Sequence, residues 1–584
     1  MLPNDPLKRV LTVDLTRRSF SVEERTDLFK ERLGGVGAGI RLLTEECPAG
    51  IDPFDPGNPI IFAVGPLVGH FPVASKTVAL FKSPHTGELG ESHAGGRSAV
   101  SIRLAGYGAI IIKGASTMPV YLVINEDGVF FRDASAIWGL RSSYTVGSVL
   151  RERETGRGTR TIMRIGRAGE NLVTYSSVIT ETYRHFGRLG LGALFGSKKL
   201  KAIVIEGKQS LPVANKRTYR QVYDHLFKAA TQTPLMKKYH ELGTAMNVVP
   251  LNTIGGLPTR NLQSGTFEGA EAISGETMAA NYLGRRIACA HCPVACIHLA
   301  ALRTPYPNDP YFYKTNMLGY DHEPIFAAGS MLGIADAPDM LRVMDEIEIL
   351  GLDVMSAGVC LAWATEAQQQ GLITTRETDS LQFTFGDADA YIQALQRIIS
   401  QPTDFYQALA HGVDYTAQIY GGEDFAMAFG RNEMPGYHTG PGAYAGYLSG
   451  ARHSHLDNAG YSLDQKVIKA GEKPDAKTLA LQLLEEERWR QVLASLVICL
   501  FARGVYSPEL SCEALETIGI SCSETGLEEL GTAILREKYA FKQREGFDLT
   551  QSRIPRRIFE TAAPWGPFEE TYVREILNQY AQNL

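Results

Sequence analysis

The chain has 584 residues, of which 44% are hydrophobic, so it is long enough for three or four domains with substantial buried cores. Its 58 basic and 64 acidic residues give a net charge of −6 and form no long runs, which excludes a nucleic-acid-binding groove and a polybasic membrane-binding face. Small molecules and other proteins are therefore the expected partners.

The N-terminal sequence lacks the apolar segment of a signal peptide, and the longest apolar run, Ala494 to Ala502, is far too short to cross a bilayer. We therefore expect a cytoplasmic protein without a membrane segment. In that compartment the eight cysteines are better explained as ligands and buried thiols than as disulfides.

Residues 7–207 read mainly as β-structure, because short apolar and β-branched runs alternate with glycine and proline. The first two runs flank a turn-like sequence at 16–18, which predicts a hairpin. The predicted strands are 10–14, 19–22, 60–64, 77–81, 109–112, 120–124, 161–163 and 202–205. Within this part only 29–33, 38–47 and 144–154 look helical.

From Lys216 onward, long segments with the 3.6-residue period of helices dominate, such as 338–350 and 478–501, and strand signals are few. We place one domain boundary near 210 and another near 425, beside Gly421 and Gly422. The expected fold class is α+β, with a β-sheet-rich domain at 1–210 followed by two mainly α-helical domains at 211–425 and 426–584.

Three glycine-rich loops lie in the β-rich part, at 34–39, 93–97 and 187–199. The first and the last do not fit the glycine spacing of a dinucleotide-binding or Walker loop. Such glycines either form tight turns or let main-chain N–H groups approach a polar ligand closely. Three of these loops in one domain indicate a large polar cofactor lying across it.

A short segment of the second predicted domain contains Cys289, Cys292 and Cys296 within eight residues. Three thiolates in one loop can occupy three corners of a soft-metal site. The spacing C-x2-C-x3-C, together with one distant cysteine, favours a [4Fe-4S] cluster. A zinc site completed by His291 or His298, a thioredoxin-like pair and a packed core without metal are the alternatives.

These features combine with further motifs at 11–15, 34–37, 82–87, 105–108, 184–202 and 348–353. Taken in this order, they resemble the tungsten-containing aldehyde ferredoxin oxidoreductase family almost from end to end. The run 187–202 and the cysteine triplet are the most specific parts of the likeness.

The resemblance implies a tungsten, or in some members a molybdenum, held between the dithiolenes of two pterin cofactors with a [4Fe-4S] cluster nearby. The first domain would be the pterin platform. The implied activity is oxidation of a small-molecule aldehyde to a carboxylic acid, with electrons passed to ferredoxin or a small iron–sulfur subunit. The resemblance leaves room for a homodimer. Alternatives are the same cofactors acting on a non-aldehyde substrate, as in aromatic thioester reduction, and a non-catalytic electron-transfer or metal protein.

The resemblance also implies site residues. Cys499 is the fourth cluster ligand, with Cys512 and Cys522 as alternatives, and Ala494 stands where the family has a pterin-binding aspartate. Glu348, Lys76 and His93 replace the aspartate, arginine and asparagine that are usual in the family. The implied cofactor-binding residues are Lys76, His93, Gly95, Arg184, His185, Gly187, Glu348, Leu352, Asp353, Asp457, Ile498 and Leu500.

By the same resemblance Glu323 and His455 are the catalytic residues, and His453 is the rival to His455. A carboxylate in a dry pocket has a raised pKa, which suits a general base near neutral pH, so we expect this of Glu323. Arg285 and Arg286 precede the triplet and either steer an acidic ferredoxin toward the cluster or are simply solvated.

Overall fold

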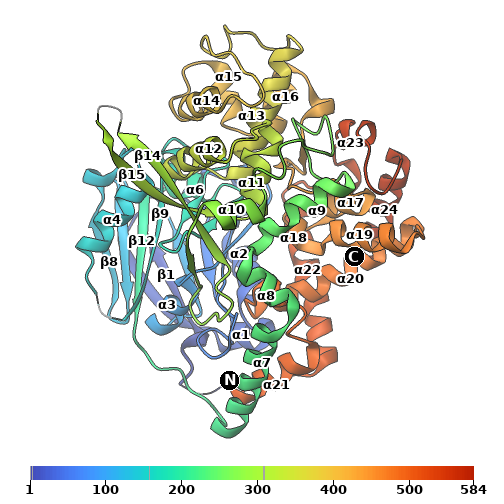
Figure 1. Cartoon of the computed structure of the whole chain (residues 1–584). Coiled ribbons are helices and arrows are strands. Elements are labelled where there is room, and N and C mark those ends of the chain that lie inside the picture. The colour runs from blue at the N-terminus through green and yellow to red at the C-terminus, as the bar shows by residue number, and fades with distance from the viewer. Residues whose placement is uncertain (1, 3, 157, 307–308) are drawn as a thin grey trace.

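The computed structural model describes residues 2, 4–156, 158–306 and 309–584. In this part of the chain, the N-terminal region forms two six-stranded sheets, drawn in blue and cyan in Figure 1. Both are mixed sheets, since β1 runs parallel to β6 and β12 runs parallel to β7. In spatial order the first contains β2 (Ser19–Glu24), β1 (Arg9–Asp14), β6 (Ala109–Lys113), β3 (Ile60–Ala63), β4 (Thr77–Lys82) and β5 (Leu89–Ala94). The second contains β11 (His185–Phe186), β10 (Val178–Ile179), β9 (Thr159–Ile165), β12 (Leu200–Gly207), β7 (Val120–Asn125) and β8 (Gly128–Asp133).

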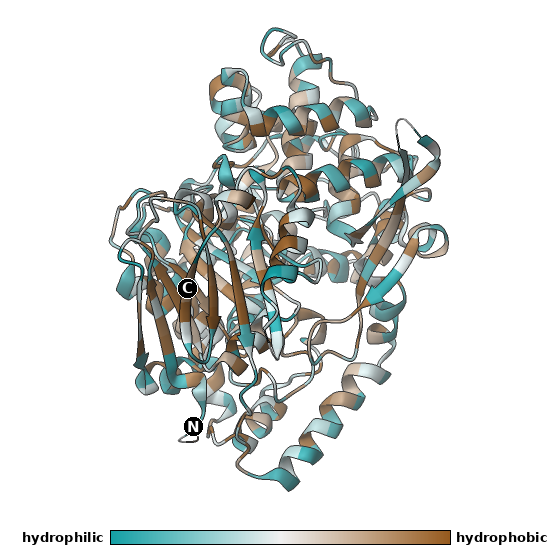
Figure 2. Cartoon of the chain, turned by 90° about the vertical axis from the view of Figure 1, so that its left-hand side faces the viewer, coloured by the Kyte–Doolittle hydropathy of each residue, from teal (hydrophilic) through white to brown (hydrophobic). Residues whose placement is uncertain are grey.

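The two sheets share one hydrophobic core. Phe62 of the first sheet is buried in the same cluster as Leu122 and Ile203 of the second. Because successive strand residues point to opposite faces, Tyr121 and Val123 lie in a different cluster on the other side of their sheet. Figure 2 shows these strands in brown over most of their length, which agrees with burial on both faces.

Short helices complete this domain. They are α1 (Thr26–Arg32), α2 (Gly35–Glu46), α3 (Ser98–Ala105), α4 (Ser143–Arg153), α5 (Arg167–Glu170) and α6 (Leu191–Ser197). α2 begins at Gly35, which has φ of 45°, and an added Cβ there would lie 2.1 Å from the carbonyl oxygen of Ala494. The glycines of this loop thus allow close packing against the main chain of a distant helix.

The remainder of the chain is mainly helical and covers one side and the top of the sheets in Figure 1. Its helices are α7 (Lys216–Gln232), α8 (Pro234–Glu241), α9 (Val248–Ile254), α10 (Gly275–Asn281), α11 (His322–Ala328), α12 (Ala337–Leu350), α13 (Val354–Gln369), α14 (Ala388–Ser400), α15 (Asp404–Leu409), α16 (Val413–Tyr420), α17 (Pro441–Ser449), α18 (His455–Asn458), α19 (Gly460–Ala470), α20 (Ala476–Ser495), α21 (Pro508–Thr517), α22 (Glu524–Arg544), α23 (Arg557–Glu560) and α24 (Glu570–Asn583).

Two small sheets interrupt the helices. One is three-stranded, with β13 (Leu283–Ile287) at its edge, β14 (Ile297–Tyr306) in the centre and β15 (Asp309–Tyr320) on the far side. The other pairs β16 (Ala428–Phe429) with β17 (Asn432–Glu433). No helix among the described residues is long and apolar enough to cross a membrane.

The observed architecture confirms the predicted α+β class and the sheet-to-helix change, since β12 ends at Gly207 and α7 begins at Lys216. The boundary near 425 stays a prediction, and buried residues on both sides of it share one core. The sequence analysis missed α3, β5, β8 and the β13–β15 sheet. It also extended the helix at 478–501 too far, because α20 ends at Ser495.

Candidate functional site

The cysteine triplet lies on the loop between β13 and β14. Two of its other residues, His291 and Ala295, have φ of 57° and 52°, so the main chain turns tightly around the cysteines. The loop is fixed to the first domain by its main chain. The N–H of Ala290 donates to Gly96 O at 2.9 Å, and the N–H of Val73 donates to His291 O at 3.2 Å.

The segment that contains Cys499 follows α20 and is fixed by the same part of the first domain. The N–H of Cys499 donates to Val73 O at 3.0 Å, and the N–H of Lys76 donates to Val497 O at 3.3 Å. Ala74 and Ile498 form an isolated β-bridge between these two contacts. Residues 73–76 therefore hold both cysteine-bearing loops side by side.

The four thiols interact electrostatically. Burial raises the pKa of Cys292 to about 12, and the nearby Cys289 and Cys499 add to this effect. Burial likewise raises the pKa of Cys296 to about 11, against the lowering effect of Arg184. Cys512 and Cys522 instead face each other, with their Sγ atoms 2.8 Å apart. The structure thus brings Cys499, the predicted fourth ligand, to the triplet.

The donor set fits an iron–sulfur cluster in its chemistry. Among the described residues, no three His, Cys, Asp or Glu side chains are close enough to hold a single metal ion. A cluster places iron and sulfide between its cysteines, so its ligands stand farther apart than those of one ion. Metal binding would displace the thiol protons, and the positive charge of Arg184 would stabilise the resulting thiolates.

Gly95 is required by the close approach of Cys289. An added Cβ at this position would lie 2.9 Å from Cys289 Sγ and 3.4 Å from Lys76 Nζ. Lys76 also lowers the pKa of Cys296, so its charge acts on the same group of thiols. Ile498 precedes Cys499 directly, and Leu500 begins the short 3₁₀ helix that follows it.

A cavity of about 120 Å³ adjoins the triplet loop. Ile297 and His298, which follow the last cysteine of the triplet, form part of its wall. The cavity brings together six of the predicted cofactor-binding residues: Arg184, His185, Gly187, Glu348, Leu352 and Asp353.

Two carboxylates of this cavity are held differently. Glu348 Oε2 lies 2.7 Å from His185 Nε2, whereas Glu348 Oε1 is buried without a hydrogen-bond partner. Asp353 Oδ2 accepts hydrogen bonds from the main-chain N–H and the hydroxyl of Ser356 and so caps α13. The free oxygen of Glu348 could accept a hydrogen bond from an N–H group of a ligand in this cavity.

The other predicted cofactor residues form a second group. His93 Nε2 lies 2.7 Å from Glu91 Oε1, and the charge of Arg452 acts on both residues. Arg452 Nε in turn pairs with Asp457 Oδ1 at 2.5 Å. Burial lowers the pKa of His93 to about 4 despite the neighbouring Glu91, so its imidazole is neutral near pH 7. His93 and Asp457 are thereby linked through one buried network.

Glu323 and His455 are in contact. Glu323 Oε1 lies 3.1 Å from His455 Nε2, and the Tyr437 hydroxyl donates to the same oxygen at 3.1 Å. Burial acts to raise the pKa of Glu323, but the hydrogen bond and charge of His455 outweigh it and hold the pKa well below its usual range. The expectation of a raised pKa at Glu323 is therefore wrong, because it left out the histidine partner.

His453 occupies a different environment. Its Nε2 lies 2.6 Å from Glu88 Oε1 and 2.9 Å from Lys542 Nζ, inside a buried charged group. Only His455 of the two histidines contacts Glu323 in the described part of the chain.

Sequence reasoning missed Asp321 and Tyr437. Asp321 lines the cavity and lies 3.3 Å from Arg184 Nη1. Burial and the charge of Glu323 raise its pKa to about 7. Its position two residues before Glu323, at the N-cap of α11, was the available signal. Tyr437 stacks on Tyr461 with ring centroids 4.1 Å apart, and no local sequence pattern marks it.

Four convergent thiols beside a buried carboxylate–histidine pair define a redox enzyme. Comparisons with known proteins agree. The family model for the N-terminal domain of aldehyde ferredoxin oxidoreductase matches residues 10–207, and the model for its domains 2 and 3 matches residues 221–582. The chain belongs to the aldehyde ferredoxin oxidoreductase family and is an oxidoreductase, as the sequence resemblance predicted.

Several relatives are similar over nearly the whole chain. The tungsten-containing aldehyde ferredoxin oxidoreductase of Thermococcus kodakarensis is 32% identical over 98% of this chain and 95% of its own length. The protein of the same name from Pyrococcus abyssi is 31% identical with the same coverage. An aliphatic sulfonate oxidoreductase, WOR-like subunit, of Pyrococcus furiosus is 29% identical over 67% of this chain and 64% of its own.

A solved structure shares the fold. It is the active site complex BamBC of benzoyl coenzyme A reductase in complex with 1,5-dienoyl-CoA. The superposition has a TM-score of 0.83 at 22% identity and covers 99% of this chain and 94% of that one.

The placement of Cys499 near the triplet gives the first prediction. We expect Cys499→Ser to lower the iron content below the roughly four irons per chain of the unsubstituted protein, because a serine hydroxyl is a poor replacement for a thiolate ligand. Cys512→Ser is the matched control and should retain full iron. Iron analysis after anaerobic purification makes the comparison, and equal iron in both variants would contradict the assignment.

The close contact at Gly95 gives the second prediction. Gly95→Ala should displace Cys289 and reduce both bound iron and the visible absorption of the cluster. Gly504→Ala is the control, since an added Cβ there meets nothing within 4 Å. Unchanged iron and an unchanged spectrum in Gly95→Ala would show that the thiol does not need this space.

Proposed function

We propose that this enzyme oxidises aldehydes to carboxylic acids at a tungsten centre held by two pterins, with molybdenum as the alternative metal. We further propose that a [4Fe-4S] cluster bound by Cys289, Cys292, Cys296 and Cys499 passes the electrons singly to ferredoxin or a similar acceptor. The metal, when bound, takes up the two electrons that aldehyde oxidation releases.

The observation that carries this proposal is the acid–base arrangement between the cavity and the thiols. Asp321 and Pro324, on either side of Glu323, line the cavity, and Asp321 pairs with Arg184. Arg184 in turn acts on Cys296 and Cys289. The Asp321 carboxylate and the thiols thus share Arg184 as a neighbour, which places a proton-binding group close to the proposed electron-transfer cluster.

The pKa values of Glu323 and Asp321 are shifted in opposite directions. Glu323 stays ionised because His455 lowers its pKa, whereas Asp321 holds a proton below neutral pH because burial and the neighbouring Glu323 raise its pKa to about 7. Pairs of titratable groups with separated pKa values mark base and acid roles. Glu323 is accordingly the base that takes a proton from the attacking water, and Asp321 is a nearby site for proton storage.

The same arrangement assigns His455 and Tyr437 to positioning. Both contact Glu323 Oε1 and so hold the carboxylate in a fixed orientation. The overall reaction balances when one aldehyde and one water give one carboxylic acid, two protons and two electrons. Each electron requires one turnover of a one-electron acceptor.

Glu323→Gln tests the assignment of the base. We expect kcat to fall by about 10²- to 10⁴-fold, the usual effect of removing a general base, with tungsten and iron content unchanged. Aldehyde-dependent reduction of a viologen dye and elemental analysis are the measurements. Normal turnover in the fully loaded variant would refute the role of Glu323. The unsubstituted enzyme with its full metal content could instead fail to reduce the dye with aldehydes but act on an aromatic thioester. That result would favour the alternative substrate class.

His455→Leu tests the electrostatic coupling. Loss of the hydrogen bond and of the electrostatic effect of His455 should raise the pKa of Glu323, so the base becomes protonated at higher pH. The acid limb of the kcat/KM profile for dye reduction should therefore move to higher pH. His453→Gln should leave that limb in place, because His453 contacts Glu88 and Lys542 instead. An equal shift in both variants would contradict the pairing.

A further inference from the structure

Helices α7 and α8 form an unusually basic segment. Residues 216–241 contain six lysines and arginines and two acidic residues, in a chain of net charge −6. The six basic residues are all exposed: Lys216, Arg217, Arg220, Lys228, Lys237 and Lys238. Neither Lys237 nor Lys238 takes part in any ion pair found among the described residues.

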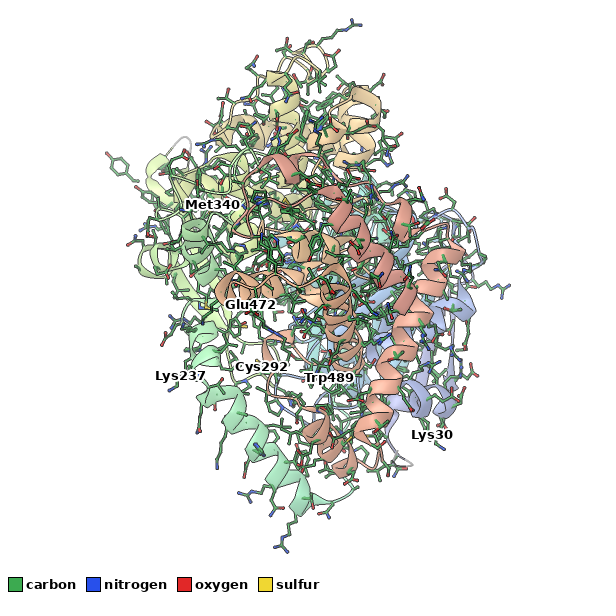
Figure 3. All side chains as sticks on the ribbon, turned by 90° about the vertical axis from the view of Figure 1, so that its right-hand side faces the viewer. Lys30, Lys237, Cys292, Met340, Glu472 and Trp489 are labelled. Atoms are coloured by element: carbon green, nitrogen blue, oxygen red, sulfur yellow. The ribbon has the colours of Figure 1, made fainter. Side chains whose placement is uncertain are left out.

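The inner side of the same segment packs over the cysteine site. Val222, Leu226 and Tyr239 are buried in the core cluster against which Cys292, Cys296 and Cys499 pack. His240 Nδ1 lies 2.8 Å from Val294 O, within the triplet loop. Helix α8 thus packs against the triplet loop, and Figure 3 shows Lys237 and Cys292 on the same side of the molecule.

An aromatic pair bridges the helix and the fourth cysteine. The rings of Tyr239 and Phe501 are stacked with centroids 4.3 Å apart. Tyr239 is buried in the core cluster against which Cys296, Cys499 and Phe501 pack. This pair therefore connects α8 with the segment that carries the fourth cysteine.

The edge strand β13 extends the basic surface. Arg285 and Arg286 are exposed on it, and Arg286 Nη2 donates to Glu241 O at 3.4 Å, at the end of α8. Leu235, with 44% of its surface exposed, adds an apolar contact point at the start of α8. We call Leu235, Lys237, Lys238, Arg285 and Arg286 the α8 face.

We propose that the α8 face is the docking surface for an acidic, one-electron iron–sulfur carrier protein. This inference rests on the proposed function. Exposed apolar area ringed by charge of one sign suits a transient partner of the opposite sign, because long-range attraction raises the association rate. Each docked carrier takes one electron, so one aldehyde and one water with two oxidised carriers give one carboxylic acid, two protons and two reduced carriers.

Charge reversal in the intact holoenzyme tests the proposal. The test variant is Lys237→Glu/Lys238→Glu. Arg285 and Arg286 are left unchanged, because they lie so near the triplet that substituting them could also disturb the cysteine site. We expect kcat/KM for an acidic bacterial ferredoxin to fall at least 10-fold at low ionic strength. The salt dependence of that reaction should flatten, since charged encounter is screened by salt. Aldehyde-dependent viologen reduction, iron content and fold by circular dichroism should not change.

Arg151→Glu/Arg153→Glu is the matched control. Both arginines are exposed on α4, at the edge of the first domain that Figure 1 shows on the far left. This variant should keep the ferredoxin rate and its salt dependence. The docking proposal is overturned if the α8 variant keeps the ferredoxin rate and its salt dependence, or if the control variant loses as much of that rate. It is also overturned if light scattering shows that the substitutions in α8 dissociate a dimer. Failure of the proposed function would appear separately, as absence of aldehyde-dependent viologen reduction in the unsubstituted enzyme.

Discussion

The site depends on main-chain pairing between residues 73–76 and two loops that are far apart in the sequence. Val73 accepts from Cys499 and donates to His291, and Lys76 donates to Val497. These main-chain hydrogen bonds fix both loops relative to the sheet domain. The four thiols are therefore held near one another by the fold. Arg184 and Lys76 supply the compensating positive charge.

The same interface explains the end of α20. Its amphipathic pattern continues to residue 501, yet the helix stops at Ser495 and Val497 adopts φ of 55°. A strained conformation at Val497 persists because its carbonyl pairs with Lys76 and its neighbour bridges to Ala74. Gly35 allows this helix end to pack closely, since a side chain there would collide with Ala494 O. The helical period of the local sequence predicts α20, but the pairing of Val497 and Ile498 with residues 74–76 ends the helix. Cys499 is thereby placed near the triplet.

Much of the fold could be predicted because its signals are local. The short apolar and β-branched runs of β1, β3 and β7 and the period of 3.6 in α12 are visible in short windows of sequence. The β13–β15 sheet was missed because its strands contain Gly284 and Gly319 and lie within helical surroundings, where short apolar runs are ambiguous. The glycine-rich loops were visible, but only the structure shows that Gly35 serves packing while Gly95 makes room for a thiol.

In the candidate site, too, some features could be predicted from the sequence and others only from the structure. Residue types and spacing marked the triplet, whereas Glu323 and His455 were predicted only through the resemblance to the family. Charge states were harder to predict, because burial and the charge of Glu323 raise the pKa of Asp321 whereas His455, from a distant segment, lowers the pKa of Glu323. The choice between His453 and His455 also required coordinates, because the two histidines are two residues apart and contact different carboxylates.

Anomalous diffraction from anaerobically grown crystals tests the central claim most directly. Data collected at the iron and tungsten absorption edges locate each metal independently. The account predicts one compact iron site bonded to Cys289, Cys292, Cys296 and Cys499, with a tungsten peak beside the cavity that Arg184 and Glu348 line. Iron located away from Cys499, or a heavy-metal peak outside that region, would contradict it.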